Sequence, residues 1–371
     1  YRPPMLMRRL EPIAGNPLVR VRMRPSMSYG PQEPLRVPGS NHVRYVGDTQ
    51  AIRVTTDMPI SYLTEEARFV LTRPVTLVLH ADETFPNSIE ETWTRFLTST
   101  RDYWLDWVRY LSVPYEWQEA VIRAAITLKL CSYEETGGVV AALTTSVPEA
   151  PGTGRNWDYR FCWLRDAYFT VHALNKLGAT LTMERFLDYM RSVVATEKGP
   201  LLKPVYAVVP EHSLHEWESE ALTGFDGDGP VRFGNAAADQ VQHDANGSLI
   251  LAASQMFSDH RLPKMGDQAL FHELEALGET AAAMAFEPDA GIWEYRGRAS
   301  IHTHSAAMCF AGCDRLARIA GRLGLRLREV YWRDHAERIR SAILERAWNP
   351  AEGYFAASFD GAGADASSLL L

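Results

Sequence analysis

The stretch PYEWQEAVIRAAITLKLC, residues 114–131, decides the structural class of most of the chain. Its large apolar side chains recur every three or four positions, at Trp117, Val121 and Leu128, which is the period of an α-helix with one buried face. The same period returns towards the C-terminus, and together the patterns predict helices at residues 114–131, 164–177, 181–195, 236–257, 266–284, 301–321 and 326–347. The repeated helix–loop–helix spacing indicates helical hairpins arranged around a central axis.

The N-terminal part of the chain follows a different pattern. Apolar residues alternate with arginines over residues 19–24, and two short apolar runs lie between residues 69 and 79. A period of two is typical of half-buried strands, so residues 1–84 are predicted to form part of an antiparallel β-sandwich. The sequence SIEE at residues 88–91 resembles a capping box and predicts the start of a helix. Residues 85–112 are therefore interpreted as a helical linker.

The composition of the 371 residues is that of a globular protein, because 46% are hydrophobic and 23% are charged. A formal net charge of −8 argues against nucleic acid as a partner, since proteins that bind nucleic acid present clustered cationic surface. Nothing in the sequence reaches the apolar run of about 18 residues that a membrane span needs. The four cysteines are too few and too scattered for a disulfide scaffold, so we expect free thiols and a cytoplasmic location.

Residues 155–166, RNWDYRFCWLRD, are the richest candidate for a functional site. They contain two Trp, one Tyr, three Arg and two Asp. The apolar face of a sugar ring stacks on aromatic side chains, while its hydroxyls need charged donors and acceptors. The segment therefore favours a sugar-binding site. An aromatic hinge closed by an Arg–Asp ion pair is the structural alternative, and composition alone does not choose between them.

Glu294 is the candidate general acid of the chain. It lies in the segment GIWEYRG, residues 291–297, between Trp293 and Tyr295. Partial burial between aromatic rings keeps a carboxyl proton available near neutral pH. Arg296 opposes this effect if its side chain folds back, and a surface glutamate paired with Arg296 is the alternative.

Two further segments contain polar residues whose spacing could line a pocket or bind a metal. In residues 232–244, RFGNAAADQVQHD, Asn235 can cap a helix that places polar side chains on an inward face, or the segment is an exposed helix start. His212 and His215 have the spacing of a metal pair, but no third ligand is evident. We therefore expect neither a metal nor another cofactor.

The segment 155–166 is similar to the signature of glycoside hydrolase family 15, the bacterial glucoamylase and trehalase-like family. Further similarities follow in the same order along the chain, at residues 230–240 (PVRFGNAAADQ), 291–294 (GIWE) and 365–367 (DAS). The stretch from residue 20 to residue 30 resembles the β-sandwich of the family. The resemblance covers nearly the whole chain.

The resemblance implies a mainly α fold with an N-terminal β domain. Residues 1–84 would be part of a super-β-sandwich, and residues 113–371 would be the N-terminal portion of an (α/α)6 barrel. It implies inverting hydrolysis that releases β-glucose from a non-reducing α-glucosyl end, with Glu294 as general acid. The residues that it implies for sugar binding are Arg165, Asp166, Trp163, Tyr159, Trp157, Trp293, Asp244 and Arg296.

An inverting glycosidase needs a second carboxyl, which acts as general base about 6.5–9.5 Å from the acid. The resemblance places this base between the last two helices of the barrel. The predicted helices make up about seven of the twelve, and both ends of the sequence resemble cuts through a longer protein. We therefore expect the base beyond residue 371 and no activity from a chain that ends there.

Several substrates and reaction classes remain open at this point. Hydrolysis of α-glucans or malto-oligosaccharides is the first expectation, and trehalase is the nearest alternative. The loops at residues 196–230 and 285–300 are expected to shape the part of the pocket that distinguishes them. A glycoside phosphorylase or a non-catalytic sugar-binding module belongs to another class. The expected partner is an α-glucoside, with no nucleic acid or membrane partner.

Overall fold

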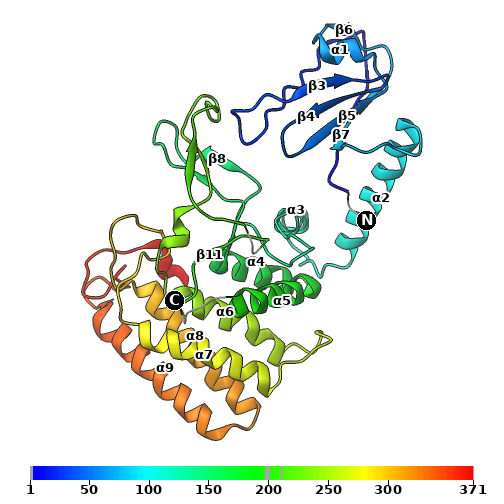
Figure 1. Ribbon diagram of the computed structural model, residues 1–371. Coiled ribbons are helices and arrows are strands. Elements are labelled where there is room, and N and C mark those ends of the chain that lie inside the picture. Colours follow the sequence, from blue (N-terminus) through cyan, green and yellow to red (C-terminus); the bar gives the residue numbers. More distant parts are fainter. Residues whose placement is uncertain (1–2, 197–200, 210–211, 371) are drawn as a thin grey trace. The chain divides into compact units, whose positions relative to one another are not determined.

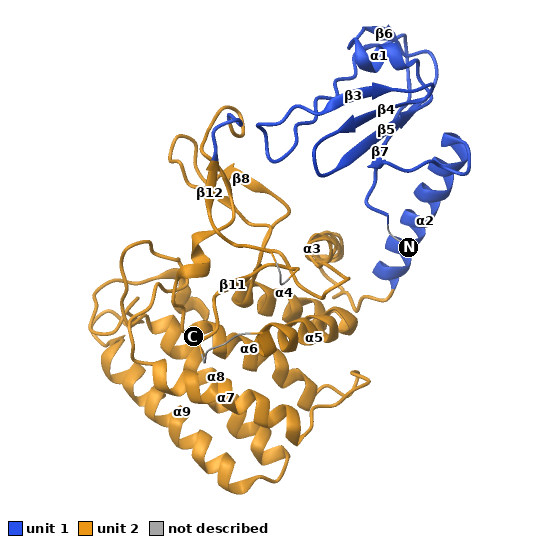
Figure 2. Cartoon of the chain, viewed as in Figure 1, with its two compact units in different colours: residues 1–109, 219–223 blue, residues 110–218, 224–371 orange. Residues whose placement is uncertain are grey.

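The computed structural model describes residues 3–196, 201–209 and 212–370, so parts of the expected pocket loop at residues 196–230 lie outside it. The chain divides into two compact units (Figure 2). Unit 1 is Tyr1–Arg109 with Ser219–Thr223, and unit 2 is Tyr110–Glu218 with Gly224–Leu371. Each unit has its own hydrophobic core.

Unit 1 is built on an antiparallel sheet. Its strand order is β1 (Leu6–Leu10), β7 (Val75–Ala81), β5 (Ala51–Thr56), β4 (His42–Val46) and β3 (Leu35–Pro38). A separate pair joins β2 (Leu18–Val19) to β6 (Phe69–Val70). Alternate residues of β4 are buried, as the period of a half-buried strand requires. The strand expected over residues 19–24 is wrong beyond Val19, because β2 ends there.

Two helices follow within unit 1. The short helix α1 (Ile60–Thr64) had no clear signal in the sequence. The longer helix α2 (Ile89–Arg109) begins where the capping box predicts. The Glu91 backbone N–H donates to Ser88 Oγ over 3.2 Å, which satisfies one of the free amides at a helix start.

Unit 2 contains the helices that the period of 3.6 residues predicts (Figure 1). Their mutual packing forms the largest core of the chain, with α6 and α8 in close contact. At Gly247 in α6 a Cβ atom would lie 2.2 Å from the Met308 carbonyl oxygen of α8, so this approach requires glycine. The helices are α3 (Gln118–Leu130), α4 (Leu164–Lys176), α5 (Thr180–Thr196), α6 (Asp244–Ser254), α7 (Gln268–Met284), α8 (Thr303–Arg322) and α9 (Arg326–Arg346).

The predicted helix at residues 236–257 is interrupted in the structure. The expected helix at residues 236–257 is divided into η1 (Ala236–Asp239), α6 and η2 (Gln255–Phe257). Asn235 does cap its first part, because its side chain accepts from the Ala237 N–H. The backbone then becomes extended at Gln240, with ψ of 156°. The break turns the side chain of Gln240 towards Glu294, where it donates to the backbone carbonyl.

The long loops of unit 2 contain short strands. The strand β8 (Thr145–Pro148) pairs with β9 (Asn156–Asp158), and β10 (Cys162–Trp163) pairs with β11 (Val205–Tyr206). A third pair joins β12 (Trp217–Ser219) to β13 (Val231–Phe233). These pairs give the segments before α4 and α6 a defined path. In the described part of the chain, no helix is both long enough and apolar enough to span a membrane.

Candidate active site

A cavity of about 1030 Å³ lies in unit 2, at the start of α4. Its wall includes residues from the loops before α4 and α6 and from the loop that precedes α8. Eight of the nine predicted site residues line it: Glu294, Arg165, Asp166, Trp163, Tyr159, Trp157, Trp293 and Arg296. The structure therefore brings together segments that are more than 130 residues apart in the sequence.

The Glu294 carboxylate is anchored through one oxygen. Oε1 accepts hydrogen bonds from Trp163 Nε1 over 2.5 Å, from Gln242 Nε2 over 3.2 Å and from Arg165 Nη2 over 3.4 Å. No described residue donates to the other oxygen, Oε2. A carboxyl that is held on one side and free on the other can exchange a proton with a ligand in the cavity.

The backbone around Glu294 forms a tight turn. Glu294 has φ of +55°, between the left-handed glycines Gly291 at +70° and Gly297 at +77°. A non-glycine residue keeps this conformation only where its surroundings hold it, and such positions cluster at functional sites. Here the Gln240 side chain donates to the Glu294 carbonyl over 3.1 Å. The turn therefore directs the carboxyl into the cavity.

Arg165 occupies the first turn of α4 and is mostly buried. Its Nη1 donates to Gln242 Oε1 over 2.9 Å and to Asp244 Oδ2 over 3.3 Å. Burial alone would lower the pKa of Arg165, but Asp244, Asp166 and Glu294 outweigh it and raise the pKa. The guanidinium is therefore a fixed positive charge beside the candidate acid.

Asp166 lies next to Arg165 on the cavity wall. Its Oδ2 is buried and accepts no hydrogen bond from any described residue, since the Nε atom of Arg165 is 3.6 Å away. Burial raises the pKa of Asp166. The Asp166 side chain as a whole is 46% exposed and lines the cavity, so its carboxyl can accept from a ligand hydroxyl there.

Asp244 differs from the expectation that it lines the pocket. It is fully buried at the start of α6 and contacts the cavity only through Arg165. Its place behind the guanidinium arises because α6 begins at this residue and points its first turn at α4. Asp244 therefore orients Arg165.

The Arg–Asp ion pair of the structural alternative is present in the segment 155–166, while a sugar-binding role for the rest of the segment stays a prediction. The Asp158 carboxylate is fully buried and accepts from Arg160 Nε over 2.9 Å and from Arg160 Nη2 over 2.8 Å. This ion pair closes the loop and leaves Arg165 and Asp166 at the cavity. Asp158 and Arg160 thus form a structural ion pair, whereas Arg165 and Asp166 face the cavity.

The sequence assigns no role to three contributors to the site, although two of them lie in the segment 232–244, whose polar side chains it can place on an inward face. Gln242 and Gln240 reach Glu294 through the break in the predicted helix. Glu149 accepts from the Tyr159 hydroxyl over 2.8 Å and from Arg155 Nε over 2.7 Å, and burial together with Glu149 raises the pKa of Tyr159. No local sequence signal distinguishes Glu149 from other surface glutamates.

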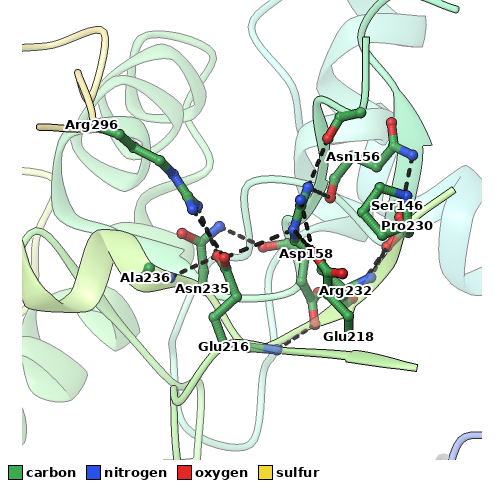
Figure 3. Close-up of polar contacts among 12 residues, drawn as sticks. Ser146, Asn156, Asp158, Glu216, Glu218, Pro230, Arg232, Asn235, Ala236 and Arg296 are labelled. Carbon is green, nitrogen blue, oxygen red and sulfur yellow. Dashed lines mark hydrogen bonds and ion pairs between the residues drawn. The ribbon is translucent and has the colours of Figure 1, made fainter. Parts of the chain in front are cut away.

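The arginine and histidines that the sequence alternatives concern have other surroundings in the structure. Arg296 does not pair with Glu294, because its guanidinium binds Glu216 (Figure 3). His212 and His215 line a separate cavity of about 380 Å³. Among the described residues, no three His, Cys, Asp or Glu side chains are placed to bind a metal ion.

Comparisons with known proteins agree with the resemblance. The model of glycosyl hydrolases family 15 matches residues 116–371. A trehalase of Mycobacterium tuberculosis is 34% identical over 293 residues, which are 78% of this chain and 42% of that protein. A trehalase of Thermoplasma volcanium is 27% identical over 362 residues, or 95% of this chain and 56% of that protein.

Solved structures with a similar fold also match the chain. A bacterial glucoamylase complexed with acarbose matches 88% of this chain and 50% of that chain, with a TM-score of 0.57 and 14% sequence identity. At this identity the similarity concerns the fold. The chain spans about half the length of the curated relatives that it matches.

Proposed function

Since the chain belongs to glycosyl hydrolases family 15, we propose that the full-length protein is an inverting α-glucosidase that acts on trehalose. The observation that supports this substrate most directly is the similarity to proteins named trehalase in Mycobacterium tuberculosis and Thermoplasma volcanium. It reverses the order expected from the sequence, in which malto-oligosaccharides came first. The bacterial glucoamylase that matches at 14% identity is similar in its fold.

The geometry of the cavity supports the chemistry. Its volume of about 1030 Å³ is at the upper end of the range of about 300–1000 Å³ that small-molecule sites span. Asp166 and Arg165 supply a partly exposed carboxyl and a fixed cation for the hydroxyls of one glucose unit. Glu294 lies beside them, because its Oε1 is 3.4 Å from Arg165 Nη2.

In the proposed reaction, Glu294 gives its proton to the oxygen that links the two glucose units. The bond from this oxygen to the anomeric carbon breaks, and water attacks the opposite face of the sugar. The water proton passes to a second carboxylate, which inverting enzymes hold about 6.5–9.5 Å from the acid. We assign this base to no residue of the chain. Trehalose would yield one β-glucose and one α-glucose.

We also propose the detailed architecture that the family implies. Helices α3 to α9 would belong to an (α/α)6 barrel, and the sheet of unit 1 would belong to a super-β-sandwich. The predicted boundaries were residues 84 and 112, whereas α2 groups with unit 1 and the second unit begins at Tyr110. A cytoplasmic location stays a prediction, supported by four free thiols.

The test is glucose release by the full-length protein from trehalose, maltose and maltotriose, with the anomers followed by proton NMR. We expect the largest kcat/KM on trehalose, with equal initial amounts of the α and β anomers. Faster release from maltotriose would instead support the malto-oligosaccharide substrate. A requirement for phosphate would indicate a phosphorylase, and binding without turnover would indicate a sugar-binding module.

A further inference from the structure

A second charged cluster borders the same cavity, and its centre is Glu216. Its two carboxylate oxygens accept from Arg296 Nη1 over 3.0 Å and from Arg296 Nη2 over 2.8 Å (Figure 3). Oε2 also accepts from the Ala236 backbone N–H over 3.0 Å. Burial alone would raise the pKa of Glu216, but Arg296 and this amide outweigh it and lower the pKa. Glu216 is therefore a carboxylate that holds Arg296 in one orientation.

Arg296 is placed over an aromatic ring. Its Cζ atom lies 4.2 Å from the centre of the Trp157 ring, and both residues line the cavity. The Cζ atom of Arg232 lies 4.7 Å from the same centre, and its Nη1 donates to the Gly154 carbonyl over 2.7 Å. Cation–π contacts of this kind restrict the ring. Trp157 thus holds the Arg296 guanidinium at the cavity wall.

The cluster borders the cavity at a place distinct from Arg165. Arg165 contacts Glu294, whereas Arg296 lines the same cavity and binds Glu216 instead. If the first glucose unit binds at Arg165, the linking oxygen lies near Glu294. The departing sugar then extends towards Arg296 and Trp157.

We propose that Glu216 is a positioning residue for the subsite of the departing sugar, in which Arg296, held over Trp157, would contact the sugar. The inference rests on the proposed function. A guanidinium has five N–H donors, and Glu216 engages two of them, so Arg296 retains donors for sugar hydroxyls. The Trp157 ring lies under this guanidinium and fixes its plane. Glu216 itself does not line the cavity and would act on the ligand only by holding Arg296.

The test compares a ligand with two rings and a ligand with one ring in the full-length protein. We would measure kcat/KM for trehalose and the inhibition constant of 1-deoxynojirimycin, a single-ring inhibitor that fills only the glucose end. Glu216→Gln should lower kcat/KM for trehalose about tenfold, since it loses the charged partner of a bidentate pair. It should change the inhibition constant less than twofold. Glu337→Gln is the matched control, because Glu337 forms an exposed ion pair with Arg340 over 3.0 Å, and it should change neither value.

Two results would overturn the proposal while the proposed function stands. Equal losses for trehalose and 1-deoxynojirimycin would mean that Glu216 supports the whole site, and no loss for either would mean that it has no role. Arg296→Lys, which keeps the charge without the fork, should reproduce the selective loss and serves if Glu216→Gln does not fold. A wild-type protein that is inactive on trehalose and maltose would refute the proposed function itself.

Discussion

Two glutamates of unit 2 have similar partners and different surroundings. Glu294 Oε1 accepts from the indole N–H of Trp163 and from Arg165. Glu275 Oε1 accepts from the indole N–H of Trp332 over 2.7 Å and from Arg328 Nε over 2.5 Å. The difference is at the second oxygen. Glu275 Oε2 lies 2.9 Å from His272 Nδ1, whereas no described residue donates to Glu294 Oε2.

The backbone conformation also differs between Glu275 and Glu294. Glu275 is in the middle of α7, where the helix determines its direction towards α9. At Gly278, one turn later, a Cβ atom would lie 2.7 Å from Trp332, so glycine admits the indole ring. Glu294 is held in a left-handed turn. The comparison shows that both carboxylate oxygens of Glu275 have protein partners, whereas Glu294 has one oxygen available to a ligand.

The largest effect is expected from Glu294→Gln. The amide cannot donate the proton of the proposed reaction, so turnover should fall by roughly 10² to 10⁴, the share that acid catalysis usually supplies. The measurement is kcat on trehalose, with thermal unfolding as the control for an intact fold. An unchanged rate would remove Glu294 from the role of general acid.

Glu275→Gln should have the opposite profile. It removes a buried charge from three partners, so the free energy of unfolding should fall by about 2–3 kcal/mol. Turnover at 25 °C should stay near that of the wild type, because Glu275 does not line the cavity. Denaturant unfolding and kcat measured on the same preparation would check both statements. A loss of turnover without a loss of stability would contradict the structural role of Glu275.

The contribution of Glu275 should also depend on pH. Burial alone would raise the pKa of Glu275, but the hydrogen bonds from Trp332, His272 and Arg328 outweigh it and lower the pKa. A lowered pKa stabilises the fold above the unfolded value of about 4.3 and loses that effect as the pH falls through the folded value. The stability difference between wild type and Glu275→Gln should therefore be constant above about pH 5 and shrink in stronger acid.

The smallest effects are expected from the two tryptophans. Trp163→Phe removes one of three donors to Glu294 Oε1, which should lower kcat about tenfold, as about 1.4 kcal/mol implies. Trp332→Phe removes the matching donor to Glu275 and should lower the melting temperature by a few degrees with no change in kcat. Equal effects of both variants on both measurements would mean that the two carboxyls do not differ in function.

The sequence alone determined most of the helices and the candidate acid. The period of the apolar residues predicted a helix at 164–177, and α4 spans Leu164–Lys176. It predicted 326–347, and α9 spans Arg326–Arg346. This succeeds because helical hydrogen bonds and buried faces depend on residues within a few positions of each other. The residue types made Glu294 a candidate acid, and the family resemblance supported that role and implied one in sugar binding for Arg165 and Asp166. The structure places all three around one cavity.

Only the tertiary structure decided how the charges are paired. Arg296 binds Glu216, which is 80 residues away, and not its neighbour Glu294. The predicted helix at 236–257 breaks so that Gln240 and Gln242 reach Glu294, and Asp244 lies behind Arg165. These contacts join segments that are distant in sequence. Their choice depends on which partners the packed helices bring within hydrogen-bond distance, and no local pattern contains that information.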